Sequence, residues 1–206
     1  FMFELLESLL AMHLHQGGCA ILLTATLSQN HRNRLATIWL SAGGLPAQVL
    51  QETEFPLATK VSLNPIKPLI EQPLASRVDV SRDVKVSFLH DIESCVDKVL
   101  TAAAQGQCVV WVRNSVDDAL KAYRSLQRQM NNPDNCLLFH SRFVLQDRKN
   151  IENRVLDIFG KSSNTELRAG KVLIATQVFQ ESLDADADVM ICDICPIDDL
   201  IQRAGR

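Results

Sequence analysis

Polar side chains that can hold phosphate oxygens follow several apolar runs of this 206-residue chain. They are Thr24 and Thr26 after ILL, His140, Ser141 and Arg142 after CLLF, Thr176 and Gln177 after VLIA, and Gln202, Arg203 and Arg206 after the final DLI. Hydroxyls can bind a nucleic-acid phosphate without reading its base, and an arginine fork fits the oxygens of a transferring phosphoryl group. The pattern predicts a site for a phosphate-rich ligand, although each group alone is weak because strand ends are polar in many proteins.

The elements that must position these residues alternate regularly from about residue 84. The runs VKVSFLH, QCVVWVR, NCLLFH, GKVLIAT and DVMICDI predict strands, separated by helices over 92–104, 116–130 and 144–159 and followed by a last helix. Solid apolar strands alternating with amphipathic helices indicate an α/β fold, with a parallel sheet covered by helices on both faces. Ligands of such sheets bind beyond the carboxyl ends of the strands, where the polar residues stand.

The first part of the chain is organised differently. Helical spacing of apolar residues predicts a helix over 3–16, the run CAILLTAT predicts a short buried strand, and a second helix is expected over 28–42. Prolines at 46, 56, 65, 68 and 73 favour an extended linker with short strands. We therefore expect three segments, 1–45, 46–83 and 84–206.

Composition restricts the partners only weakly. The formal net charge of -3 provides no global basic field, so a polyanion must be held by local clusters. The 6 cysteines lie mostly in apolar runs, which predicts reduced, buried thiols and a cytoplasmic location. No apolar run is long enough to cross a membrane. The pair Cys192 and Cys195 has C-x-x-C spacing, but on a strand the two side chains point to opposite faces, so no metal site is expected.

The order of five motifs resembles the third to sixth motifs of superfamily 2 helicases. These are TAT (24–26), VVWVRNSVDDA (109–119), FHSRFVLQDRKNIENRVLDIFGK (139–161), VLIATQVFQESLDAD (172–186) and LIQRAGR (200–206). The long third stretch is more similar to the CRISPR-associated helicase-nuclease of type I systems than to DEAD-box RNA helicases. The same is true of Ser182 before Leu183 in the fourth motif and of Gln202, which opens the fifth. Type I-E is the preferred subtype.

The resemblance implies two RecA-like domains, of which residues 1–45 would be the end of the first, a helix-strand-helix remnant, and 84–206 most of the second. It implies contacts with single-stranded DNA by Thr24, Thr26, His140, Ser141, Arg142, Thr176 and Gln177. Ala25 would belong to the same motif as Thr24 and Thr26. Asp184 and Arg206 would contact ATP, and Gln202, Arg203 and Arg206 would form the catalytic group, with Arg206 as an arginine finger.

The sequence contains no G-x-x-x-x-G-K-[ST] and no DExH motif. The resemblance therefore implies that the phosphate and Mg²⁺ ligands, and a nuclease domain, belong to a longer parent protein, and that this chain alone does not hydrolyse ATP. The implied partners are single-stranded DNA and an RNA-guided surveillance complex. Because the first segment offers apolar faces with few partner strands, residues 1–45 are expected to allow self-association.

Three alternatives stay open at the level of sequence. The nearest is a superfamily 2 DNA repair or RNA helicase. A catalytically inert protein-interaction module would bind a protein partner and not DNA. A nucleotide-binding oxidoreductase or transferase of the doubly wound type is disfavoured, because no G-x-G-x-x-G follows any predicted strand.

Overall fold

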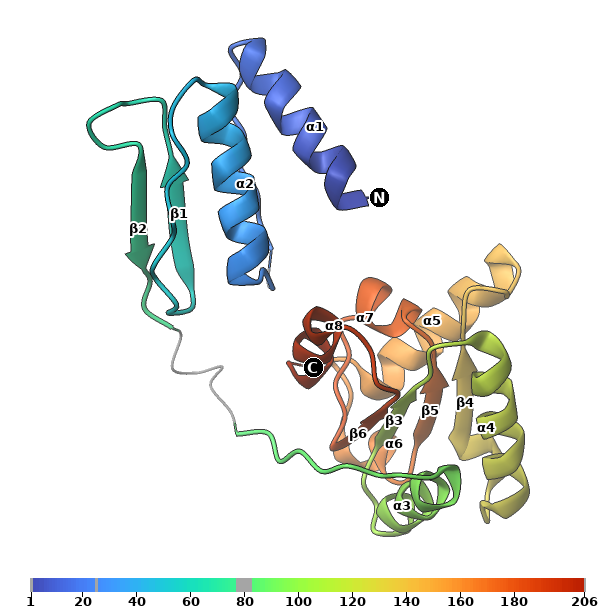
Figure 1. The fold of residues 1–206 in the computed structure, drawn as a ribbon. Coiled ribbons are helices and arrows are strands. Elements are labelled where there is room, and N and C mark those ends of the chain that lie inside the picture. Colours follow the sequence, from blue (N-terminus) through green and yellow to red (C-terminus); the bar gives the residue numbers. More distant parts are fainter. Residues whose placement is uncertain (1, 25, 77–82, 206) are drawn as a thin grey trace. The chain divides into compact units, whose positions relative to one another are not determined.

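The structure is a computed structural model that describes residues 2–24, 26–76 and 83–205 (Figure 1). The chain divides into two compact units, Phe1–Asp83 and Val84–Arg206. The segment 46–83, predicted as a linker with short strands, contributes a hairpin to the first unit.

Unit 1 combines two helices with a hairpin. Its elements are α1 (Met2–His15), α2 (Gln29–Ala42), β1 (Leu57–Val61) and β2 (Leu69–Pro73). Ser28 begins α2, because its side chain accepts a hydrogen bond from the backbone N–H of His31. The strands β1 and β2 pair antiparallel. Leu40 and Leu50 are fully buried in this unit.

The predicted strand CAILLTAT is wrong. Residues 19–24 and Thr26 are assigned to no strand, and Ile21 and Leu23 are 86% and 91% exposed. A strand requires a neighbour to complete its backbone hydrogen bonds, and in the described part of unit 1 the strands β1 and β2 pair with each other. The described residues between α1 and α2 therefore form no strand.

Unit 2 contains the predicted parallel sheet. Its strands are β3 (Val109–Val112), β4 (Cys136–Phe139), β5 (Val172–Ala175) and β6 (Val189–Cys192), in the order β4-β5-β3-β6. All described pairs are parallel, and Val112 lies opposite both Ala175 and Cys192. The carboxyl ends of β3, β5 and β6 therefore meet at one edge of the sheet.

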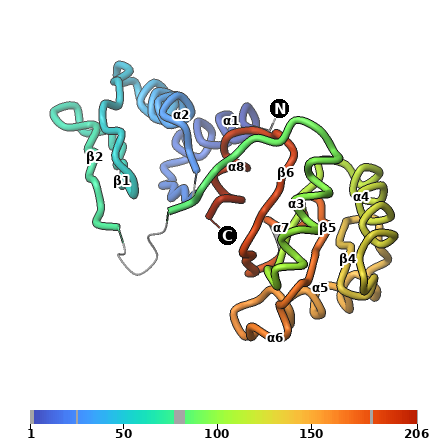
Figure 2. The backbone as a smooth tube through the Cα atoms, turned by 90° about the horizontal axis from the view of Figure 1, so that it is seen from below, coloured from blue at the N-terminus to red at the C-terminus, as the bar shows by residue number. Residues whose placement is uncertain are grey.

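Helices cover both faces of this sheet, as predicted. The larger ones are α3 (Ile92–Ala104), α4 (Val116–Gln129) and α5 (Leu145–Phe159), and the shorter ones are α6 (Thr165–Arg168), α7 (Val178–Ser182) and α8 (Ile197–Ala204). Val109 and Trp111 pack with α3 and α4, whereas Val110 and Val112 pack with α5 and α7. Figure 2 shows α4 and α5 on opposite sides of β4. The sequence did not predict α6 and α7.

The predicted strand VKVSFLH is also wrong. Residues 84–90 are assigned to no strand, and Val86 and Phe88 are 74% and 79% exposed. The alternating apolar pattern was suitable for a strand, but the segment does not pair with the edge strand β6. It leads into α3, where the side chain of Asp91 accepts a hydrogen bond from the N–H of Ser94 at 2.6 Å.

Candidate functional site

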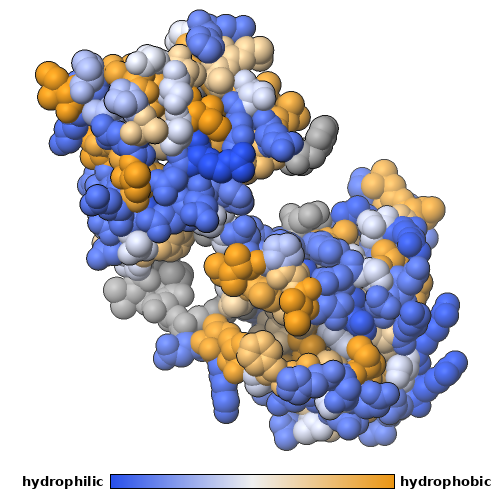
Figure 3. Space-filling view, viewed as in Figure 1, coloured by the Kyte–Doolittle hydropathy of each residue, from blue (hydrophilic) through white to orange (hydrophobic). Residues whose placement is uncertain are grey.

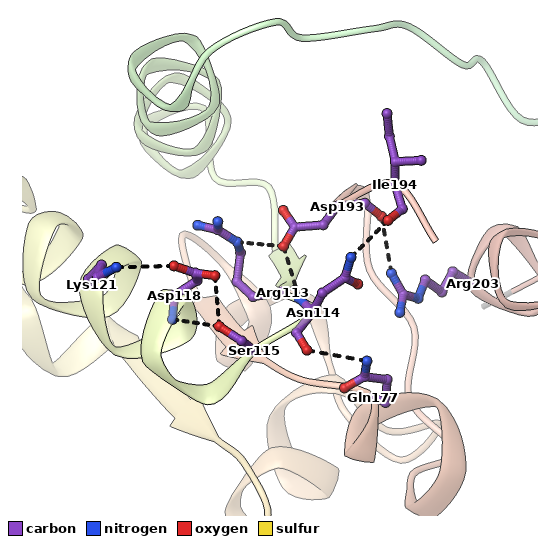
Figure 4. A network of polar contacts seen from close by, with 9 residues as sticks. All are labelled: Arg113, Asn114, Ser115, Asp118, Lys121, Gln177, Asp193, Ile194 and Arg203. Carbon is purple, nitrogen blue, oxygen red and sulfur yellow. Dashed lines mark hydrogen bonds and ion pairs between the residues drawn. The ribbon is translucent and has the colours of Figure 1, made fainter. Parts of the chain in front are cut away.

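A polar network joins the carboxyl ends of β3 and β6 (Figure 4). The carboxylate of Asp193, one residue after β6, accepts hydrogen bonds from Nε of Arg113 at 3.0 Å and from the backbone N–H of Asn114 at 2.9 Å. The side-chain amide of Asn114 donates to the carbonyl of Ile194 at 2.8 Å. Arg113 is buried and its guanidinium lies over the Trp111 ring. These contacts fix the two loops relative to each other.

The end of β5 approaches the same network. Thr176 is buried, and its backbone N–H donates to the carbonyl of Phe139 on β4. Gln177 is half-buried, and its Nε2 donates to the carbonyl of Asn114 at 3.4 Å (Figure 4). The structure therefore brings the predicted pair Thr176 and Gln177 to the loop that follows β3.

At the end of β4 one predicted residue is buried and two are exposed. His140 is 6% exposed, its ring stacks on Phe143 with centroids 4.2 Å apart, and its Nδ1 accepts from the N–H of Arg142. Burial lowers the pKa of His140, and the nearby Arg142 acts in the same direction. Ser141 and Arg142 are exposed, and Arg142 pairs with Asp117 at 2.7 Å. The buried imidazole thus holds the turn that presents the exposed side chains.

Thr24 and Thr26 form a local turn in unit 1. Thr24 Oγ1 donates to the carbonyl of Thr26 at 2.8 Å and accepts from its N–H at 3.1 Å. Thr24 is exposed and Thr26 is half-buried. The turn lies just before the residue that begins α2.

The residues predicted to contact a nucleotide are divided between the surface and the interior. Asp184 is exposed and pairs with Lys161 at 2.7 Å, and Gln202 is exposed on α8. Arg203 is 2% exposed. Arg206 lies outside the described residues. The exposed carboxylate of Asp184 can accept hydrogen bonds from ligand hydroxyls, whereas Arg203 holds α8 from within unit 2.

A glutamine that the sequence did not single out contacts Arg203. Gln180, on α7, accepts from Nε of Arg203 at 2.8 Å and donates from its Nε2 to Asp199 at 2.7 Å. Asp193 and Asn114 were missed as well, although Asp193 directly follows an apolar run and Asn114 stands two residues after one. A search for polar residues after every apolar run would have found Asp193 and Asn114. Nothing in the sequence, by contrast, pairs Gln180 with α8.

Cys192 and Cys195 are both half-buried. Among the described residues, no group of at least 3 His, Cys, Asp or Glu side chains is arranged to hold a metal ion. Within the same part of the chain, no helix has the length and apolar character that crossing a membrane requires.

The sequence is similar to a known protein family. Residues 105–206 match the family model of the C-terminal part of the CRISPR-associated nuclease/helicase Cas3. The CRISPR-associated endonuclease/helicase Cas3 of Escherichia coli (strain K12) is 34% identical over 213 residues, covering 100% of this chain and 23% of the relative. The protein of the same name from Thermus thermophilus is 27% identical, covering 98% of this chain and 25% of the relative.

Solved structures agree with these sequence matches. A crystal structure of T. fusca Cas3 with ADP superposes with a TM-score of 0.80 at 29% identity, covering 100% of this chain and 25% of that chain. A chain in a CRISPR RNA-guided surveillance complex, pre-nicking, gives 0.79 at 29% identity, covering 100% of this chain and 27% of that chain. The chain spans about a quarter of the length of these relatives.

Proposed function

Because this chain belongs to the family of the CRISPR-associated nuclease/helicase Cas3, we propose that it forms the C-terminal part of the helicase core of such an enzyme. The parent enzyme would be an ATP-dependent single-stranded-DNA translocase that unwinds and helps degrade invading DNA in type I CRISPR interference, in the cytoplasm. The observation that carries the proposal is the network that joins the ends of β3, β5 and β6 to one another. It supports the strand-end loops from which a helicase domain contacts its ligands.

The DNA-binding side consists of the exposed groups after β4 together with the residues that hold them. Ser141 and Arg142 are accessible to a phosphate, whereas His140 is buried beneath them and keeps its Nδ1 as an acceptor. The ion pair of Arg142 with Asp117 is exposed on both sides, and such pairs contribute little. A DNA phosphate can therefore replace Asp117. Thr176 and Gln177, with Thr24 and Thr26 of unit 1, complete the proposed set.

On the nucleotide side, ATP would supply the free energy for translocation. Asp184 and Gln202 fit that side because both are polar and exposed. Arg206 would stabilise the charge that develops on the phosphoryl oxygens, and Arg203 would hold the helix that leads to it. Solved structures of T. fusca Cas3 with ATP and with ADP support nucleotide binding in the family. The phosphate and Mg²⁺ ligands would come from a P-loop and an acidic motif, neither of which this sequence contains.

The proposed partners are single-stranded DNA and an RNA-guided surveillance complex, which is named for one structural neighbour. Self-association through residues 1–45 is also proposed, because Ile21, Leu23 and Met12 are exposed apolar side chains of that segment. A pure protein-interaction module is the alternative that these exposed residues favour.

Binding of a fluorescent single-stranded oligonucleotide by the chain, followed by anisotropy at several salt concentrations, tests the DNA-binding proposal. Arg142→Ala should weaken binding. It should also make the negative slope of log K against log salt shallower by about 0.7, the value for one phosphate contact on a single strand. Asp117→Ala should strengthen binding, because it frees Arg142. Arg128→Ala, an exposed arginine of α4, is the matched control. Equal losses of affinity for Arg142→Ala and Arg128→Ala, or an affinity that does not change with salt concentration, would oppose the proposal.

A further inference from the structure

Helix α8 buries little apolar surface. Its one buried side chain is that of Arg203, Leu200 is half-buried, and Ile197 and Ile201 are 63% and 52% exposed. Figure 3 shows hydrophobic surface, in orange, at the place that α8 occupies in Figure 1. Amphipathic helices usually bury their apolar stripe. The position of α8 therefore depends on the hydrogen bonds of its polar face in addition to the packing of Leu200.

Those hydrogen bonds converge on one side-chain amide. Gln180 is 8% exposed and uses both ends of its amide on α8: Oε1 accepts from Nε of Arg203 at 2.8 Å, and Nε2 donates to Oδ1 of Asp199 at 2.7 Å. Asp199 and Arg203 are four residues apart, so they lie on the same face of the helix. A glutamine suits this place because it is both a donor and an acceptor.

Arg203 has few other partners. Its Nη1 reaches the carbonyl of Asp193 at 3.4 Å, a long contact, and its Nη2 is buried without a hydrogen-bond partner among the described residues. Among those residues Arg203 forms no ion pair, since Asp193 is paired with Arg113. The hydrogen bond to Gln180 is therefore the shortest one that the buried guanidinium of Arg203 forms with the described residues. Losing a hydrogen bond to a buried charge lowers stability markedly.

We propose that Gln180 is a positioning residue that clasps α8 through Arg203 and Asp199. Gln180 belongs to α7, which follows the end of β5, and Arg203 reaches the backbone at the end of β6. The clasp thus ties the loop that would contact DNA, through Thr176 and Gln177, to the helix that carries Gln202. The consequence for hydrolysis rests on the proposed function, whereas the clasp itself concerns only unit 2.

Hydrogen exchange on the chain, read peptide by peptide, tests the clasp directly. Gln180→Leu keeps a similar shape but removes both hydrogen bonds, so amides of α8 should exchange roughly ten- to a hundredfold faster. Protection in β3 and β5 should stay unchanged, which shows that unit 2 remains folded. Gln129→Leu is the matched control, because among the described residues the amide of Gln129 bonds to Ser125, within its own helix α4.

A paired substitution distinguishes a clasp from simple packing. Gln180→Glu places a carboxylate oxygen against that of Asp199, while its other oxygen still accepts from Arg203. Adding Asp199→Asn replaces that carboxylate with an amide donor and restores both contacts. Asp199→Asn should therefore slow α8 exchange in the Gln180→Glu background and leave exchange unchanged in the Gln180→Leu background.

The functional consequence is measured in the proposed parent enzyme. Gln180→Leu should lower kcat for DNA-stimulated ATP hydrolysis with little change in KM, and the Gln180→Glu/Asp199→Asn pair should restore kcat. Unchanged α8 exchange in Gln180→Leu, or an absent rescue by Asp199→Asn, would overturn the clasp. Altered α8 exchange without any change in hydrolysis would retain the clasp and refute its link to the proposed function.

Discussion

Removing the carboxylate of Asp193 should destabilise unit 2 through the loops that form the proposed site. In Asp193→Ala, Nε of Arg113 and the N–H of Asn114 both lose their acceptor. Breaking a buried ion pair costs roughly 3–5 kcal/mol. The Asp193 side chain is 25% exposed and that of Arg113 10%, so water replaces part of the loss. We expect about 2–3 kcal/mol, equivalent to a fall in Tm of roughly 6–12 °C for a domain of this size.

Tryptophan fluorescence in a urea titration provides the assay. The chain has 2 tryptophans, Trp39 in unit 1 and Trp111 in the centre of unit 2. A Trp39→Phe background makes Trp111 the single reporter of unit 2. The control is Asp117→Ala, which breaks an ion pair exposed on both sides and should cost at most about 1 kcal/mol. A loss below about 1 kcal/mol for Asp193→Ala, or equal losses for both variants, would refute the reasoning.

Three further predictions concern two buried side chains and the activity of the chain alone. Since burial lowers the pKa of His140, the folded state binds fewer protons than the unfolded state just below pH 6.5. The stability of unit 2 should therefore fall on acidification through this range, and His140→Asn, compared by urea titrations at several pH values, should weaken that dependence. Burial raises the pKa of Cys136 to about 12, so at pH 8 iodoacetamide should label exposed Cys19 first and Cys136 only after unfolding, as mass spectrometry of digests can show. The chain alone should show no ATP turnover above a blank in a phosphate-release assay, and turnover that co-purifies with it would contradict its assignment as part of a helicase core.

The sequence predicted the sheet well because its two central strands, β3 and β5, are buried on both faces. Val109 to Val112 are all fully or almost fully buried, and such strands read as solid apolar runs bounded by polar residues. The helices were found for a related reason, since α3 and α4 each turn one stripe of small or apolar residues towards the sheet.

The two wrongly predicted strands show that an apolar pattern does not specify a pairing partner. Ile21, Leu23, Val86 and Phe88 have the composition of strand residues, yet each segment needs a pairing partner that its own sequence cannot specify. The clasp at Gln180 was unpredictable for a similar reason. Its partner Arg203 lies 23 residues away, and their contact depends on where α7 and α8 pack.

The central proposal is that α8 leads to an arginine that acts on ATP in a DNA-dependent motor. The most direct measurement is ATP hydrolysis by the proposed parent helicase-nuclease, with and without single-stranded DNA, in the wild type and in Arg206→Ala. The account predicts stimulation by single-stranded DNA but not by RNA, and a loss of about 10³-fold or more in kcat for Arg206→Ala with DNA binding retained. Undiminished hydrolysis in Arg206→Ala, or equal stimulation by RNA, would contradict it.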